Sequence, residues 1–174
     1  MVAARTETDA ERFRKLGAEK VEAVGNIKFD REPAALPANP PHGRLVLFGS
    51  THPGEEKIAI DIFRRLQKEN PGLRAIIAPR HIERAAEVAA LTGGARRSQG
   101  WFNEDILVLD THGELAGLYA VCEVAFIGGS LVPIGGHNPL EAAIHGVPTV
   151  WGPHVANFRD ACGLLERHGG YPAR

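Results

Sequence analysis

A glycine-rich loop that ends in a polar residue and a carboxylate is the part of the sequence best suited to chemistry. The stretch GGSLVPIGGHNPLE, residues 128–141, contains two glycine pairs and ends near Asn138 and Glu141. Asn138 suits an N-cap, Pro139 suits the first helical position, and Glu141 has the spacing of a capping-box glutamate. Unpaired backbone N–H groups and the helix dipole attract anions at such a turn. The stretch therefore predicts a site for a phosphate or a similar anion.

A purely structural interpretation of the same residues stays open. Asn138 and Glu141 would then only cap a helix, and the glycines would only serve the turn. The loop holds more glycine than a strand-to-helix turn needs, which favours binding. The two interpretations are also compatible, because a capping carboxylate lies at the mouth of the same site.

Further polar residues directly follow short apolar runs. Because ligands of open parallel sheets bind beyond the carboxyl ends of the strands, we expect these residues to face a single crevice. One guanidinium, several hydroxyls, glycine N–H groups and a carboxylate together suit phosphate and sugar hydroxyls. The residues that follow apolar runs are Ser50, Thr51, His52, Arg80, His81, Asp110, Thr111, His112 and the glycine loop Gly128, Gly129 and Ser130.

The elements that must position these residues alternate between strands and helices. Apolar runs without alternation predict buried strands, and helical spacing predicts helices between them. Such alternation gives right-handed βαβ units, so the predicted fold class is α/β, with a parallel sheet flanked by helices. The expected strands are 44–49, 73–78, 106–109, 124–127 and 149–151. The expected helices are 53–69, 82–91, 113–121, one from 138 onward and 155–167, with a frayed end at 169–174.

The first 41 residues differ from the rest. A charged helix is expected over 8–16 and a short strand over 21–24, and the proline-rich stretch 33–41 is typical of an extended linker. We therefore predict a domain boundary between Gly17 and Pro41. Residues 1–41 would be the end of a preceding domain plus a linker, and 42–174 the main domain.

The overall composition excludes several classes of protein. The formal net charge of −1 gives no electrostatic case for nucleic acid. No apolar run approaches the roughly 18 residues that cross a membrane, and the N-terminus has no signal-peptide hydrophobic region. The chain is therefore expected to be soluble. Cys122 and Cys162 lack metal-binding or disulfide spacing, so we expect buried, reduced thiols.

Several catalytic and cofactor motifs are missing from the sequence. It contains no GxGxxG, GxxxxGK[ST] or GxSxG pattern, so a dinucleotide fingerprint, a P-loop and a hydrolase elbow are not predicted. The eight histidines form no HExxH or comparable ligand cluster, so no metal is expected. Arg96 and Arg97 are expected in a solvated loop.

Several segments, taken in order, resemble the C-terminal half of 3-deoxy-D-manno-octulosonic acid (Kdo) transferase, a glycosyltransferase of lipopolysaccharide inner-core synthesis. The resemblance covers nearly the whole chain from about Asp9 onward, and the ordered set is far more specific than any single motif. The segments are GNIKFD (25–30), STHPGEE (50–56), APRHIER (78–84), DTHGEL (110–115), FIGGSLVPIGGHNPLEAA (126–143) and WGPH (151–154).

The resemblance implies the C-terminal domain of a GT-B glycosyltransferase, a Rossmann-like domain that binds the donor CMP-Kdo. The N-terminal domain of such an enzyme binds the lipid A precursor and supplies a glutamate as general base. The resemblance places that domain outside this sequence apart from the helix over 8–16, so this chain alone is expected to be inactive. The intact enzyme would work at the cytoplasmic face of the inner membrane, associated peripherally, as a metal-independent, inverting transferase without a cofactor.

The resemblance also implies roles for single residues. Glu141 would accept hydrogen bonds from the ribose hydroxyls, and the loop Gly128–Ser130 with the N–H groups near Asn138 would receive the phosphate. Arg80 would pair with the phosphate or the Kdo carboxylate, and His81 would lie beside it. Ser50 and Thr51 would line the same pocket, and Lys28, in the hinge segment, would reach the donor when the two domains close.

Two alternatives of other classes remain open from the sequence. A sugar-nucleotide epimerase has a similar GT-B donor domain, but it would prefer UDP-sugars and act without a lipid acceptor. A non-catalytic nucleotide-binding module would bind nucleotides weakly and without selectivity, and a change of Glu141 would not abolish that binding. The ordered set of motifs favours the transferase.

Overall fold

The computed structural model describes residues 1–26, 30, 32–101 and 104–173. The chain divides into two compact units, Met1–Glu32 and Pro33–Arg174. The division falls between the predicted limits of the domain boundary. That residues 1–41 belong to a preceding domain stays a prediction.

The first unit consists of two layers, a two-stranded sheet and one helix. Strand β1 (Val2–Ala4) pairs in parallel with β2 (Val21–Ala23), and helix α1 (Glu7–Lys15) connects them. The helix begins where the Thr6 side chain accepts a hydrogen bond from the backbone N–H of Asp9 at 3.1 Å. A small apolar core of Ala4, Ala10 and Val21 joins the layers.

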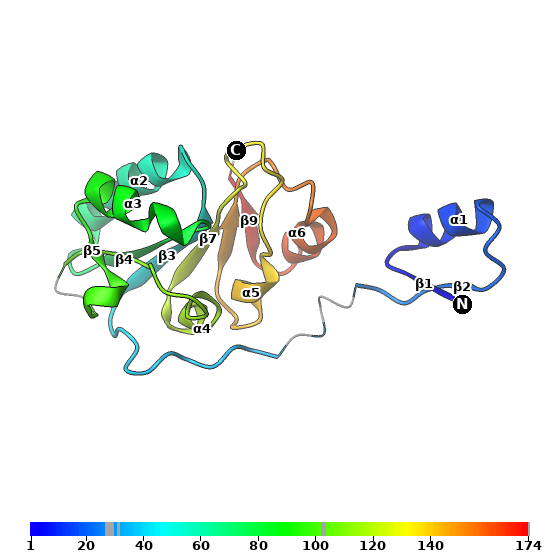
Figure 1. The fold of residues 1–174 in the computed structure, drawn as a ribbon, viewed down its shortest axis with the longest axis horizontal. Helices are drawn as coiled ribbons and strands as arrows, with labels where there is room; N and C mark the ends of the chain where they lie inside the picture. The colour runs from blue at the N-terminus through cyan, green and yellow to red at the C-terminus, as the bar shows by residue number, and fades with distance from the viewer. Residues whose placement is uncertain (27–29, 31, 102–103, 174) are drawn as a thin grey trace. The chain divides into compact units, whose positions relative to one another are not determined.

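The second unit is built on a parallel sheet, which confirms the predicted fold class. Its described residues form seven strands in the order β5-β6-β4-β3-β7-β8-β9, and each neighbouring pair is parallel (Figure 1). The strands are β3 (Leu45–Thr51), β4 (Arg74–Pro79), β5 (Ala95–Arg96), β6 (Ile106–Val108), β7 (Val124–Ile127), β8 (Thr149–Trp151) and β9 (Gly170–Pro172).

Helices cover both faces of this sheet (Figure 1). The α-helices are α2 (Glu55–Glu69), α3 (Ala85–Thr92), α4 (Leu115–Leu118), α5 (Leu140–Ala143) and α6 (Arg159–Leu165). Short 3-10 turns are η2 (Ile82–Arg84), η3 (Arg97–Gln99) and η4 (Tyr119–Val121). Successive residues of a strand point to opposite faces, so β3 feeds both cores. Val46 and Phe48 pack with α2 and α3, whereas Leu45 and Leu47 pack with α4, α5 and α6.

Two predictions about the sheet edges were wrong. Residues 169–174, expected to fray, contain β9, because Gly170 lets the chain lie against Trp151: a Cβ at Gly170 would be 2.3 Å from that ring. Arg96 lies in β5 and not in a solvated loop. The guanidinium of Arg97 lies 3.8 Å from the ring centroid of Trp101 and 2.8 Å from the carboxylate of Glu114.

The described residues also bear on two expectations from composition. Cys122 and Cys162 are free and buried, as predicted. Burial raises the pKa of the Cys122 thiol to about 12 and that of Cys162 to about 11. Among the described residues, every helix is too short or too polar to cross a bilayer.

Candidate functional site

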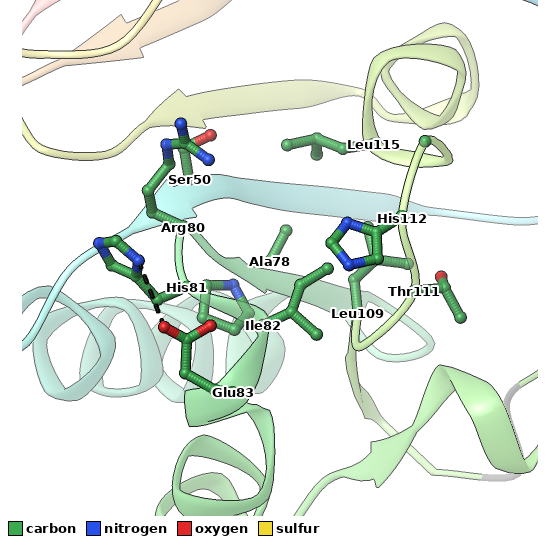
Figure 2. Close-up of a pocket in the computed structure, with 12 residues that line it drawn as sticks. Ser50, Ala78, Arg80, His81, Ile82, Glu83, Leu109, Thr111, His112 and Leu115 are labelled. Carbon is green, nitrogen blue, oxygen red and sulfur yellow. Dashed lines mark ion pairs between the residues drawn. The ribbon is translucent and has the colours of Figure 1, made fainter.

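A cavity of about 640 Å³ lies beyond the carboxyl ends of β3, β4 and β6. Figure 2 shows Arg80 and Ser50 at one end of it and His112 and Thr111 at the other, with apolar side chains between them. The apolar residues include Ile82, Leu109 and Leu115. The cavity therefore offers a cationic end, several hydroxyls and an apolar middle.

A bulge at the end of β3 directs Ser50 into this cavity. Ser50 has φ +56°, a left-handed conformation that is rare outside glycine, and the register with β4 shifts between Gly49 and Thr51. Gly128 makes the arrangement possible, because a Cβ there would be 2.3 Å from the Ser50 carbonyl oxygen. The glycine loop and the bulge are thus fitted to each other.

The cavity brings together only part of the predicted residues. Ser50, Arg80, His81, Thr111 and His112 line it, as the rule for strand ends predicts. His81 also lies 3.6 Å from the carboxylate of Glu83. Lys28 lies outside the described residues.

Thr51 and Asp110 turn away from the cavity. The Thr51 hydroxyl is fully buried and donates to a carboxylate oxygen of Glu56 at 3.2 Å. The Asp110 carboxylate accepts from the backbone N–H of Ser98 at 2.7 Å and from its hydroxyl at 2.6 Å. The prediction that Thr51 lines the pocket was therefore wrong, because the bulge at Ser50 turns the next side chain into the protein.

The glycine loop is not an empty anion site, because a carboxylate of the chain itself fills it. Glu55, at the start of α2, is fully buried. Its oxygens accept hydrogen bonds from the backbone N–H groups of His52 (2.9 Å), Gly129 (2.7 Å), Ser130 (3.0 Å) and Leu131 (2.9 Å). The predicted phosphate contacts of the loop are thus taken by Glu55.

The other groups of this loop also have partners. The Gly128 N–H donates to the Gly49 carbonyl at 2.8 Å. The Ser130 hydroxyl donates to the Ile127 carbonyl and accepts from the backbone N–H of Gly152 at 2.9 Å. In the ligand-free chain these residues therefore join the ends of β3, β7 and β8, and the assignment of Gly128, Gly129 and Ser130 as phosphate ligands stays a prediction.

Asn138 and Glu141 mark the start of α5 close to this loop. The Asn138 side-chain oxygen accepts from the backbone N–H of Leu140 at 3.2 Å, but the N-cap of α5 is Pro139, so the predicted helix start at Asn138 and Pro139 was one residue too early. Burial raises the pKa of Tyr119, and the nearby charge of Glu141 raises it further. The same Glu141 charge acts on His137. Glu141 therefore lies close enough to both Tyr119 and His137 for its charge to act on them.

Three histidines form a cluster behind the cationic end of the cavity. The Nε2 atoms of His52 and His137 are 2.8 Å apart. The ring of His81 meets that of His52 edge-on, with centroids 5.7 Å apart. Burial is the largest cause that lowers the pKa of His52 and of His137, and the Arg80 charge acts in the same direction. At neutral pH the two imidazoles are therefore uncharged in the ligand-free chain.

A solved structure decides the family of this chain. The C-terminal CMP-Kdo binding domain of WaaA from Acinetobacter baumannii is similar at a TM-score of 0.69 and 33% identity. The match covers 75% of this chain and 73% of that one. This chain belongs to the Kdo transferase family. The resemblance inferred from the ordered motifs is thereby confirmed, as is the assignment to a GT-B C-terminal domain.

Other Kdo transferases match nearly the whole chain. The 3-deoxy-D-manno-octulosonic acid transferase of Aquifex aeolicus is 34% identical over 174 residues, 97% of this chain and 48% of that protein. The enzyme of Haemophilus influenzae is 34% identical over 184 residues, 95% of this chain and 43% of that protein. The chain thus spans about half the length of the curated relatives it matches. No family model matches it.

Membership of the Kdo transferase family favours the transferase over the epimerase and the non-catalytic module. It does not by itself assign roles to residues. Glu55 and His137 were given no role from sequence, and His52 was expected only to face the crevice, whereas the structure places it behind the cavity wall. Glu55 and His52 stand in the STHPGEE segment and His137 in the long glycine segment. The signal that could have pointed to these residues was the presence of two histidines and a glutamate in the most specific motifs.

Proposed function

We propose that this chain binds CMP-Kdo in the cavity beyond β3, β4 and β6, as the donor domain of a Kdo transferase. The observation that carries the proposal is the cavity itself. It lies at the sheet edge where such folds bind ligands and has Arg80 at one end, in a chain similar to a solved CMP-Kdo binding domain.

The lining of the cavity suits the parts of a nucleotide sugar. Arg80 would pair with the phosphate or with the sugar carboxylate, because a guanidinium binds either in a two-pronged geometry. Ser50 and Thr111 would add hydroxyls, and Ile82 and Leu115 would contact the base. Because Glu55 occupies the loop N–H groups, Arg80 and not Gly128–Ser130 is the main phosphate ligand of the proposal.

The transfer itself would need groups outside this chain. We propose an inverting displacement in which a domain outside it positions the lipid A precursor and deprotonates its hydroxyl while CMP leaves. Arg80 would stabilise the charge that develops on the departing phosphate. Such an enzyme would associate peripherally with the cytoplasmic face of the inner membrane. Among the described residues, no group of three or more metal-ligating side chains is placed to hold an ion.

Calorimetric titration of CMP and UMP into the chain tests the proposal. We expect saturable binding that prefers CMP. Arg80→Ala should weaken CMP binding about 10- to 100-fold, since a hydrogen bond to a charged group contributes about 1.5–3 kcal/mol. Arg65→Ala, an exposed arginine on the far part of α2, is the matched control and should bind like the wild type. Equal or tighter binding of UMP, or unchanged binding by Arg80→Ala, would contradict the proposal.

A further inference from the structure

The contact between His52 and His137 is a hydrogen bond between two imidazoles. Their Nε2 atoms are 2.8 Å apart, their ring planes differ by 4°, and their centroids are 5.0 Å apart. Parallel rings stacked with an offset can share this centroid distance, but their atoms stay at van der Waals separation, roughly 3.5 Å or more. Nitrogens 2.8 Å apart therefore indicate that the two rings meet edge to edge through their Nε2 atoms. A contact this short requires one hydrogen between the nitrogens.

This geometry limits how many protons the pair can hold. In the neutral pair one ring carries its proton on Nε2 and donates, and the other accepts through an unprotonated Nε2. One added proton keeps the bond and strengthens it, because an imidazolium then donates to a neutral imidazole. A second added proton would place two N–H groups against each other and break the bond. The pair therefore accommodates one positive charge.

The pair is held in place by the carboxylate of Glu55. The backbone N–H of His52 and that of Gly129 both donate to the same Glu55 oxygen, at 2.9 and 2.7 Å. A Cβ at Gly129 would be 3.0 Å from the His137 ring, so the imidazole rests directly on the glycine loop. Glu55 thus holds His52 directly and holds the loop against which His137 lies, although the two histidines are 85 positions apart in sequence.

Charged groups surround the pair on all the elements that pack against it. Glu55 and Glu56 from α2 and Glu141 from α5 favour its protonation, whereas Arg80 and His81 after β4 oppose it. His81 lines the cavity and its ring lies against His52, so the pair is one ring behind the cavity wall. An anion that binds Arg80 would cancel the opposing charge and add a favourable one.

We propose that His52 and His137 form a proton-accepting pair that takes up one proton when an anionic ligand, a phosphate or a carboxylate of a nucleotide sugar, binds beside Arg80. The pair would turn a neutral part of the site into a cationic one only when an anion is present. This inference rests on the proposed function, because it concerns the same cavity.

Calorimetry of CMP binding in two buffers that differ in ionisation enthalpy, HEPES and Tris, measures the protons taken up. The titrations are made at pH 7.5, where a phosphate monoester, with a second pKa of about 6, is already dianionic. We expect uptake of close to one proton by the wild type. The affinity should also fall up to about tenfold for each unit of pH above 7.5, since bound protons and bound ligand are linked.

The variant His137→Gln removes the acceptor of the proton but keeps a hydrogen-bonding group at the position of Nε2. It should bind CMP with proton uptake close to zero and little pH dependence. His52→Gln should show the same loss of proton uptake. With two variants, the test remains possible if one of them does not fold. His168→Asn, an exposed histidine elsewhere, should retain the wild-type uptake.

The outcomes separate this inference from the proposed function. If CMP binds without proton uptake, or if uptake persists in both glutamine variants, the pair does not take up the proton and the inference is wrong. The proposed function would stand in that case. If the wild type does not bind CMP at all, the proposed function fails and the inference falls with it.

Discussion

The carboxylate of Glu55 accepts a hydrogen bond from the backbone N–H of Gly129 at 2.7 Å, although the two residues are 74 positions apart. This contact joins the start of α2, which follows β3, to the loop that follows β7. It therefore connects the carboxyl ends of these two neighbouring strands. In many folds a glycine loop at this position leaves its N–H groups for a ligand. Here a carboxylate of the chain itself accepts from these N–H groups, so the loop links two elements that border the site.

Replacing Glu55 by glutamine should destabilise the chain by about 2–4 kcal/mol. An amide oxygen can accept from only some of the N–H groups that the carboxylate now satisfies, and the amide NH₂ would face the others. Each buried donor left without a partner costs about 1–3 kcal/mol. Urea denaturation followed by circular dichroism measures the loss. Glu69→Gln, at the exposed end of the same helix, should change the stability by less than about 0.5 kcal/mol. Equal stabilities of the two variants would sink this account of the loop.

Gly128→Ala should destabilise the chain by about 1–3 kcal/mol, since overpacking of a rigid backbone contact has a cost of this size. Its Cβ would be 2.3 Å from the carbonyl oxygen of Ser50, and a backbone atom cannot rotate away. The same change should weaken CMP binding, because Ser50 lines the cavity. Gly163→Ala is the matched control: it lies in α6, where nothing is within 4 Å of an added Cβ. Alanine there should leave the stability unchanged or raise it by up to about 1 kcal/mol.

Much of the fold was predictable from local pattern. Strand β7 (Val124–Ile127) and strand β8 (Thr149–Trp151) were predicted with the bounds that the structure has. The first is an apolar run that ends at Gly128, and the second lies between Pro148 and Gly152. The cavity residues Ser50, Arg80 and His81 followed from the rule for parallel strand ends. In both cases the signal lies within a few residues of the element it describes.

The parts that could not be predicted depend on contacts distant in sequence. No local pattern pairs Glu55 with Gly129 or His52 with His137. The short strands β5 and β9 exist only because a neighbouring strand is there to pair with them. From sequence Glu55 was only part of the helix expected over 53–69, and the loop N–H groups were assigned to a phosphate. The most specific motif thus proved partly structural.

The stability of the chain should fall as the pH is lowered from 7.5 to 5.5. Burial lowers the pKa of both His52 and His137 below the usual value of 6.5. Between the lowered and the usual value the unfolded chain binds more protons than the folded one, so stability increases with pH in this range. This contribution is fully present above about pH 6.5 and is lost below it.

Urea denaturation at pH 7.5, 6.5 and 5.5 measures this dependence. The variant His137→Gln, which cannot titrate at that position, should show a smaller loss of stability between pH 7.5 and 5.5 than the wild type. His168→Asn, which removes an exposed histidine, should keep the wild-type dependence. A wild-type curve that is flat over this range would show that the two imidazoles are not held neutral by the fold.

Glu141 should determine whether the site distinguishes ribose from deoxyribose. If its carboxylate accepts a ribose hydroxyl, the wild type should bind CMP about tenfold or more tightly than 2′-deoxy-CMP, the size expected for one hydrogen bond to a charged group. Glu141→Gln should weaken CMP binding and reduce this preference, with little effect on 2′-deoxy-CMP. Glu166→Gln, an exposed residue just beyond α6, serves as the control. A preference for CMP that survives unchanged in Glu141→Gln would mean that this carboxylate caps α5 and leaves the ribose to another residue.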